Sequence, residues 1–133
     1  SKTIIKDVRI ANQSWKKKHT MAIKSAYGSS PFFIHYFEDI TNIINANYNF
    51  LVDLNQSIID YFISEIQIKK KIFKTEKYIK NYTENHIDFR LKLNGLKNYK
   101  KYHQVFGNFF VPNLSVIDLI FNLGPESNTY LNN

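Results

Sequence analysis

The sequence feature that most constrains how this chain can fold is a short apolar segment between two prolines near the C-terminal end of the sequence. Pro112 ends the aromatic run before the segment, because proline restricts the preceding residue to extended conformations and cannot donate a backbone hydrogen bond. Gly124 and Pro125 follow the segment, and glycine followed by proline commonly ends a helix. The apolar residues between them recur at helical spacing, at Leu114, Ile117, Ile120 and Phe121. We therefore predict a short, mostly buried helix at residues 115–123.

Polar residues in this segment can serve the structure or a functional site. Asn113 or Ser115 can cap the helix, and Ser115 with Asp118 forms a variant of the capping box. Asp118 and Asn122 lie four residues apart and therefore share one face of the helix. Capping and turn contacts are a structural use for these groups, and contact with a substrate is the alternative.

Helical periodicity predicts three longer helices earlier in the chain, at residues 15–27, 31–44 and 50–66. Lys16, Lys17 and Lys24 fall on the expected solvated face of the first helix. The side chains expected to face the core are Trp15, His19, Ile23 and Ala26 in the first helix, Phe33, Phe37, Ile40 and Ile44 in the second, and Leu51, Leu54, Ile58, Phe62 and Ile66 in the third.

Alternation of side chains predicts strands at residues 3–10 and 70–79. Because helices separate these strands in the sequence, a crossover connection would make them parallel neighbours in one sheet. The expected fold class is therefore α/β and helix-rich, with about four helices and two or three short strands. A chain of 133 residues suits a single domain over residues 1–133.

Composition excludes several classes of protein. The chain has no cysteine, which excludes disulfides and thiolate metal sites, and it carries no paired-histidine or phosphate-loop motif. We therefore predict no metal and no cofactor. No apolar run approaches the roughly 18 residues that span a bilayer, and no signal peptide is recognisable, so we expect a cytoplasmic protein without a membrane span.

The net charge of +7 is concentrated in residues 69–101, which carry 11 basic and 3 acidic side chains. Such a block is typical of proteins that bind nucleic acid or other polyanions. The chain has only two arginines, however, and arginine is the preferred reader of phosphates and base edges. Weak, nonspecific nucleic-acid binding through this block is therefore kept as an alternative function.

Residues with catalytic chemistry cluster between positions 86 and 118. A histidine exchanges protons near neutral pH, a carboxylate can orient it, and an arginine can hold a phosphate or carboxylate. Only eight residues separate Gln104 from Asn113, and Gly107 allows a turn between them, so we expect these segments to approach each other. These residue types suit acyl or amide transfer onto a polar, phosphorylated substrate. The candidates are His86, Asp88, Arg90, Tyr102, His103, Gln104, Asn113, Ser115 and Asp118.

This region also resembles a known family. Residues 110–122 (FVPNLSVIDLIFN) closely resemble the C-terminal motif of the WbqC-like family of bacterial proteins, and residues 102–107 (YHQVFG) resemble its lead-in. The resemblance covers nearly the whole chain. The further positions that agree with Bacteroidetes-type members are residues 5–10 (IKDVRI), Trp15, His19, Ala26, Tyr27, residues 30–33 (SPFF) and residues 88–90 (DFR).

The resemblance implies a function in the synthesis of O-antigen and other surface polysaccharides. The implied activity is a transferase that moves a glycyl, aminoacyl or acyl group onto an amino sugar, with a nucleotide-linked amino sugar as the small-molecule substrate. Related members carry a further N-terminal α/β segment, so the resemblance implies that these residues are the C-terminal part of a larger α/β domain. A non-catalytic scaffold or interaction module of the same pathway is the alternative.

Carried onto this sequence, the resemblance implies catalytic roles for His103 and Asp118. His103 would act as a general acid or base, and the substrate would lie at the start of the 115–123 helix, where free backbone N–H groups attract an anion or a carbonyl. The residues expected to bind the substrate are Arg90, Gln104, Asn113, Ser115, Trp15 and His19.

Overall fold

The computed structural model describes residues 3–11, 13–80 and 100–132, and the regular structure within them is helical apart from one isolated β-bridge. The elements are the 3-10 helix η1 (Ile5–Asp7), α1 (Ser14–Tyr27), α2 (Phe33–Asn45), α3 (Leu51–Glu65), α4 (Val116–Leu123), the 3-10 helix η2 (Gly124–Glu126) and α5 (Ser127–Asn132). The predicted helices at 15–27, 31–44, 50–66 and 115–123 are confirmed, with bounds that differ by one or two residues. None of the described helices is long and apolar enough to cross a membrane.

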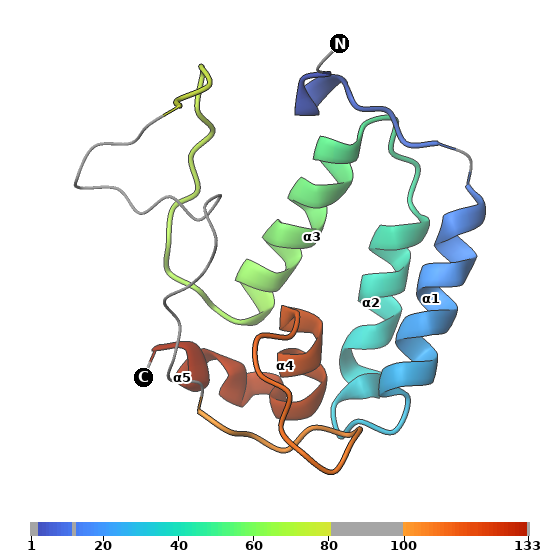
Figure 1. The fold of residues 1–133 in the computed structure, drawn as a ribbon, viewed down its shortest axis with the longest axis vertical. Helices are drawn as coiled ribbons and strands as arrows, with labels where there is room; N and C mark the ends of the chain where they lie inside the picture. Colours follow the sequence, from blue (N-terminus) through green and yellow to red (C-terminus); the bar gives the residue numbers. More distant parts are fainter. Residues whose placement is uncertain (1–2, 12, 81–99, 133) are drawn as a thin grey trace.

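Helices α1, α2 and α3 lie side by side and alternate in direction, with α2 in contact with both neighbours (Figure 1). Short connections favour this antiparallel order. Helix α4 packs against α2 at one end of the layer, and α5 follows it through η2. Residues 100–115, drawn in orange, run from the side of α5 across this end of the layer and return to the start of α4 (Figure 1).

The core lies where α4 meets α2 and α3. Ile120 and Phe121 of α4 are 1% and 0% exposed, so the predicted burial of this short helix is confirmed. The Phe121 ring packs against the rings of Phe33 in α2 and Tyr27 in α1, with a centroid distance of 5.3 Å in each case. The buried side chains of the core are Phe33, Tyr36, Ile40, Ile44, Phe62, Ile66, Ile120 and Phe121.

The prediction of an α/β fold is wrong for the described residues, which contain no strand beyond the isolated bridge. The segment 3–10 forms η1 and then contacts the residues before α3, where the Ile10 N–H donates to the Asn49 carbonyl at 3.0 Å. Residues 70–79 are exposed throughout and form no strand. A strand requires a pairing partner and usually a buried face. The segment 70–79 carries charge on both alternating faces, so neither face can pack on a core.

Lys16 is only 8% exposed, although the sequence places it on the solvated face of α1. Its ammonium group donates to the carbonyls of Asn45 and Ala46 at 3.1 and 2.7 Å. These carbonyls lie at the end of α2, where the last carbonyls of a helix lack intrahelical donors and the helix dipole is negative. Lys16 therefore caps α2 from α1. Lys17 and Lys24 are exposed, as predicted.

The buried stripes also differ from the predicted ones in α1 and α2. Tyr36 takes the buried position predicted for Phe37, which is half-buried and stacks on Phe33 with ring centroids 4.4 Å apart. His19 and Ala26, predicted to face the core, are exposed. Helix α1 lies at the edge of the helical layer, so only a narrow stripe of its surface meets α2.

Gly124 ends α4, as predicted, but the chain continues in helical form. Gly124 has φ of +54°, and a Cβ atom at this position would lie 2.5 Å from the Phe32 ring. Pro125 stands at the start of η2, which leads into α5. The Asn128 amide of α5 then donates to the Ile66 carbonyl, just after α3, at 2.6 Å. Helix α5, which the sequence did not predict, is thereby attached to the end of α3.

Candidate functional site

Asp118 is fully buried and accepts hydrogen bonds from three side chains. The Tyr102 hydroxyl and the Gln104 amide donate to Oδ2, the amide at 2.9 Å. The Asn122 amide donates to Oδ1 at 3.2 Å and to the Asp118 carbonyl at 2.8 Å. All of these groups are donors, which suits a carboxylate because its oxygens only accept. Asp118 thereby ties the first turn of α4 to residues 102–104.

Backbone groups fix the orientation of both amides. Gln104 Oε1 accepts from the Val111 N–H at 2.8 Å, and Gln104 Nε2 donates to the Val111 carbonyl at 3.0 Å. Asn122 Oδ1 accepts from the Val105 N–H at 3.1 Å. Because a backbone donor occupies each amide oxygen, each amide nitrogen faces Asp118. The loop between Val105 and Val111 is therefore held at both ends by buried side chains. We call Tyr102, Gln104, Asp118 and Asn122 the carboxylate network.

Tyr102 is the aromatic member of the carboxylate network. Burial, and then the hydrogen bond to Asp118, raises the pKa of Tyr102 well above its usual value, so its hydroxyl keeps its proton and donates. Its ring meets the rings of Phe110 and Tyr130 edge-on, with centroids 5.3 and 5.1 Å away. Burial, followed by the charge of Asp118, also raises the pKa of Tyr27. The surroundings of Asp118 thus combine hydroxyl and amide donors with packed rings.

His103 is exposed and lines a hollow of about 200 Å³ beside the carboxylate network. Gly107, with φ of +79°, makes the turn that the sequence predicted in this loop. The hollow is lined by aromatic and polar residues. The residues that line it are Tyr102, His103, Gln104, Phe106, Gly107, Asn108, Phe109 and Phe110. We call it the His103 hollow.

A second hollow, of about 230 Å³, contains the other polar candidates. Asn113 has φ of +59°, a left-handed conformation that asparagine tolerates better than most residues. Ser115 is the N-cap of α4 and accepts from the Ile117 N–H at 3.4 Å, which confirms one of the two predicted caps. The predicted capping box with Asp118 is wrong, because the Asp118 carboxylate is bonded to the other members of the carboxylate network instead. The lining is mostly apolar and consists of Tyr102, Phe110, Asn113, Leu114, Ser115, Val116, Leu119, Tyr130 and Leu131.

The segments 102–104 and 113–118 approach each other, which confirms the expectation from their spacing. Their candidate side chains nevertheless divide between two hollows that share only Tyr102 and Phe110. His103 lines one hollow and Asn113 lines the other. Asp118 lines neither hollow and has no exposed surface. The catalytic and substrate-binding roles of these residues stay predictions.

Trp15 and His19 lie on α1 and line neither hollow. The His19 Nδ1 donates to the Trp15 carbonyl at 2.9 Å, and the two rings meet edge-on at 5.2 Å, so they interact with each other. Arg90, like His86 and Asp88, falls outside the described residues. Within the described ranges, no group of three or more histidine, aspartate and glutamate side chains is placed to hold a metal ion.

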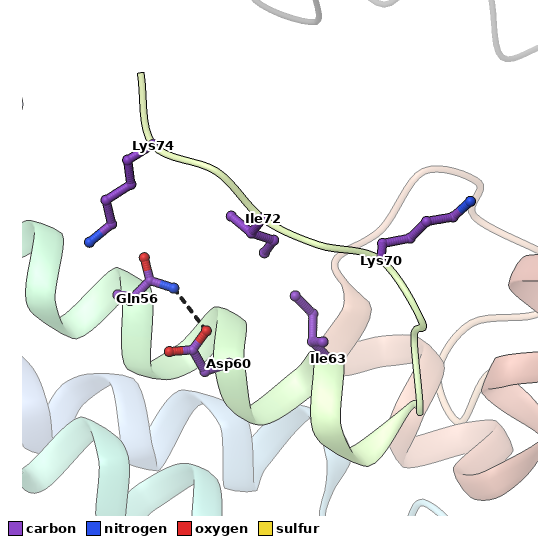
Figure 2. A pocket seen from close by; sticks show the side chains of 6 residues that line it. All are labelled: Gln56, Asp60, Ile63, Lys70, Ile72 and Lys74. Carbon is purple, nitrogen blue, oxygen red and sulfur yellow. Dashed lines mark hydrogen bonds between the residues drawn. The ribbon is translucent and has the colours of Figure 1, made fainter. Parts of the chain in front are cut away.

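A larger hollow, of about 390 Å³, lies between α3 and residues 70–74 (Figure 2). On its α3 side, the Gln56 amide donates to Asp60 Oδ1 at 2.8 Å. Lys74 extends toward α3, whereas Lys70 points away from the hollow (Figure 2). Both lysines belong to the basic block, whose described residues 69–80 are all exposed. Nucleic-acid binding by this block stays a prediction.

The sequence profile of the WbqC-like protein family matches residues 1–95 and 79–130. The chain belongs to this family. No curated protein and no solved structure matches it. In this WbqC-like chain, the matched residues include the His103 hollow and the whole carboxylate network. The family assignment made from the sequence motifs is therefore confirmed.

Tyr102 was a candidate from the sequence, but the phenylalanines that line the His103 hollow were missed as part of the candidate site. Phe106 and Phe110 pack inward, and Phe109 is 85% exposed. One signal was present in the sequence of this WbqC-like chain: three phenylalanines occur within five positions of a segment that also contains Gly107 and a nearby histidine.

Proposed function

We propose that this WbqC-like chain binds an amino sugar in the His103 hollow and transfers a glycyl, aminoacyl or acyl group to its amine, as a step in the synthesis of a bacterial surface polysaccharide. One observation carries the proposal: an exposed histidine stands next to a glutamine that is locked into the buried carboxylate network. A general base has to be accessible to its substrate and fixed in position, and a histidine exchanges protons near neutral pH.

The transfer step can be written from His103 outward. The amine nitrogen of the sugar attacks the carbonyl carbon of an activated ester or thioester, and His103 accepts a proton from that nitrogen. The new C–N bond forms as the C–O or C–S bond of the donor breaks. His103 then returns the proton to the leaving alkoxide or thiolate. The products are an amide on the sugar and a free alcohol or thiol.

Asp118 acts as a positioning residue in this scheme, since its carboxylate is fully buried and engaged by Tyr102, Gln104 and Asn122. This role replaces the catalytic one predicted from the sequence: Asp118 holds the segment that carries His103 and does not touch the substrate. The apolar second hollow shares Tyr102 and Phe110 with the His103 hollow, so it offers space beside the reacting amine for the acyl part of the donor.

A transfer assay tests the proposal. The chain is incubated with UDP-glucosamine, which carries a free amine, and with glycyl or acetyl thioesters of N-acetylcysteamine, and the sugar product is detected by mass spectrometry. His103→Ala should lower the rate by roughly 10²–10⁴ if His103 moves the proton. Because His103 is exposed, the melting temperature should stay that of the unmodified chain.

His35→Ala is the matched control, because His35 is an exposed histidine on α2 that lines neither hollow. It should transfer at the unmodified rate. Full activity of folded His103→Ala would show that another group is the base. Absence of both binding and transfer with amino-sugar acceptors would contradict the proposed function itself.

A further inference from the structure

Phe109 is 85% exposed, whereas the other two phenylalanines of the same loop are packed against neighbouring rings. Phe106 meets the Tyr27 ring with centroids 5.5 Å apart, and Phe110 meets the Tyr102 ring at 5.3 Å. The loop therefore partly buries Phe106 and Phe110 and leaves Phe109 in solvent. Single exposed apolar residues are common on proteins, so exposure alone does not indicate a site.

The loop that carries Phe109 is attached by hydrogen bonds to the rest of the protein. The exposure of Phe109 is therefore not that of a residue in a loosely held segment. Gln104 pairs with both backbone groups of Val111, and Val105 donates to the buried Asn122. Gly107 makes the turn between these anchors. Hydrogen bonds from the buried side chains of Gln104 and Asn122 thus hold the chain on both sides of Phe109, and Phe109 is among the residues that line the hollow with His103.

The size and lining of the His103 hollow indicate what it can hold. Its volume of about 200 Å³ is smaller than typical sites for drug-sized ligands, which measure about 300–1,000 Å³, so it suits a single ring. A pyranose ring has one face of C–H groups and an edge of hydroxyls or an amine. Aromatic faces carry partial negative charge and attract C–H groups, while a histidine and an amide can bond the polar edge.

We propose that Phe109 is the platform on which the pyranose ring of the substrate stacks, with His103 and Asn108 beside the polar edge of that ring. The inference rests on the proposed function and adds to it the residue that recognises the sugar. Stacking places the ring against Phe109 by its C–H face, which leaves the amine free to point toward His103. The nucleotide part of a nucleotide-linked sugar would then lie outside the hollow.

Calorimetric titration with methyl glucosaminide, UDP and UDP-glucosamine tests this inference. Phe109→Ala should weaken binding of methyl glucosaminide and UDP-glucosamine by up to roughly tenfold, which is the scale of an aromatic contact. Phe109→Leu, which keeps apolar bulk without a π face, should weaken binding in the same direction. Phe109→Trp should preserve it. Because Phe109 is exposed, all three variants should keep the melting temperature of the unmodified chain.

Phe73→Ala is the matched control, because Phe73 is 82% exposed and lines no part of the His103 hollow. It should bind all three probes as the unmodified chain does. If Phe109→Ala binds both sugars with unchanged affinity, the platform is disproved. If Phe109→Ala weakens the binding of UDP and leaves the affinity for methyl glucosaminide unchanged, Phe109 stacks on the base and the inference is equally wrong.

The transfer assay separates this inference from the proposed function. Unchanged sugar affinity in Phe109→Ala, together with loss of transfer in His103→Ala, contradicts the platform and supports the transferase. Weakened sugar affinity in Phe109→Ala, together with full transfer by His103→Ala, supports the platform and contradicts His103 as the base. Absence of sugar binding by the unmodified chain contradicts both.

Discussion

The side-chain amide of Gln104 pairs with both backbone groups of Val111, accepting from its N–H at 2.8 Å and donating to its carbonyl at 3.0 Å. This pairing has the form of a hydrogen-bonded pair in an antiparallel ladder, although one partner is a side chain. The same amide nitrogen reaches Asp118 at 2.9 Å, so one glutamine links the loop, the buried carboxylate and the start of α4.

Gln104→Glu should destabilise the fold strongly at neutral pH. The substitution keeps the shape but replaces the donor to Asp118 and to the Val111 carbonyl with a second carboxylate. Loss of buried hydrogen bonds and a buried like charge should cost about 3 kcal/mol or more in the free energy of unfolding, measured by urea denaturation.

Gln56→Glu is the control for this substitution, because Gln56 also donates to an aspartate, Asp60, but in an exposed i to i+4 pair on α3. Its cost should be about 0.5 kcal/mol or less. Equal losses in the free energy of unfolding for Gln104→Glu and Gln56→Glu would show that the carboxylate network is not buried.

Lys16→Met should destabilise the fold by about 1–3 kcal/mol, since the ammonium group donates to the last carbonyls of α2 and methionine cannot. Lys17→Met, at the exposed neighbouring position, should change the free energy of unfolding by about 0.5 kcal/mol or less. Thermal or chemical unfolding distinguishes the two. If Lys16→Met left the free energy of unfolding unchanged, Lys16 would be solvated, as its place in the sequence pattern suggests.

Phe33→Ala should cost about 3–5 kcal/mol in the free energy of unfolding, because its ring is 8% exposed and packs against Phe121 and Phe37. Phe37→Ala should cost clearly less, since Phe37 is only half-buried. Denaturant titration of the two variants gives the order directly. The reverse order would place Phe37, and not Tyr36, on the core-facing stripe of α2.

Much of the helical structure could be predicted because its signals are local. The stripe of Phe33, Ile40 and Ile44 needs only the helical period, and Ser115 and Gly124 bound α4 through their own backbone and side-chain preferences. Strands depend on a partner elsewhere in the chain. Residues 3–10 and 70–79 alternate as strands do, yet neither forms part of a sheet in the described residues. For residues 70–79 the charge on both alternating faces was a sequence signal against a strand, whereas the pattern of residues 3–10 could not show that a pairing partner is missing.

The candidate site could be predicted in its location and not in its internal arrangement. The spacing in the sequence predicted that residues 102–104 approach α4, and the hydrogen bonds from Tyr102 and Gln104 to Asp118 confirm this prediction. The direction of each side chain depends on tertiary contacts. His103 and Asn113 line different hollows, and Phe110 lines both. The capping role of Lys16 is hidden for the same reason, because it depends on where α2 ends.

Tyr102→Phe should make the chain less sensitive to alkaline unfolding. Burial and the hydrogen bond to Asp118 raise the pKa of Tyr102 in the folded state, whereas the unfolded chain keeps the ordinary value near 10. As the pH rises above 10, the unfolded chain loses this proton while the folded chain retains it, so stability falls with pH. The slope should reach at most about 1.4 kcal/mol per pH unit for this tyrosine.

The measurement for Tyr102→Phe is the free energy of unfolding at several pH values between 8 and about 11. The variant loses the hydrogen bond at every pH, so the quantity to compare is the slope of the free energy of unfolding against pH above pH 10. This slope should be less steep in the variant than in the unmodified chain. Identical slopes would mean that Tyr102 titrates in the folded protein as it does in water.

Native-state hydrogen exchange at Val105 and Val111 tests most directly whether the carboxylate network holds the loop of the candidate site. Both amides lie outside helices and donate to side-chain oxygens of Asn122 and Gln104. They should exchange at least roughly a hundredfold more slowly than in an unstructured peptide, because they open only when the network breaks. Exchange at the unstructured rate, with the Ile40 amide of the α2 core still protected, would contradict the account.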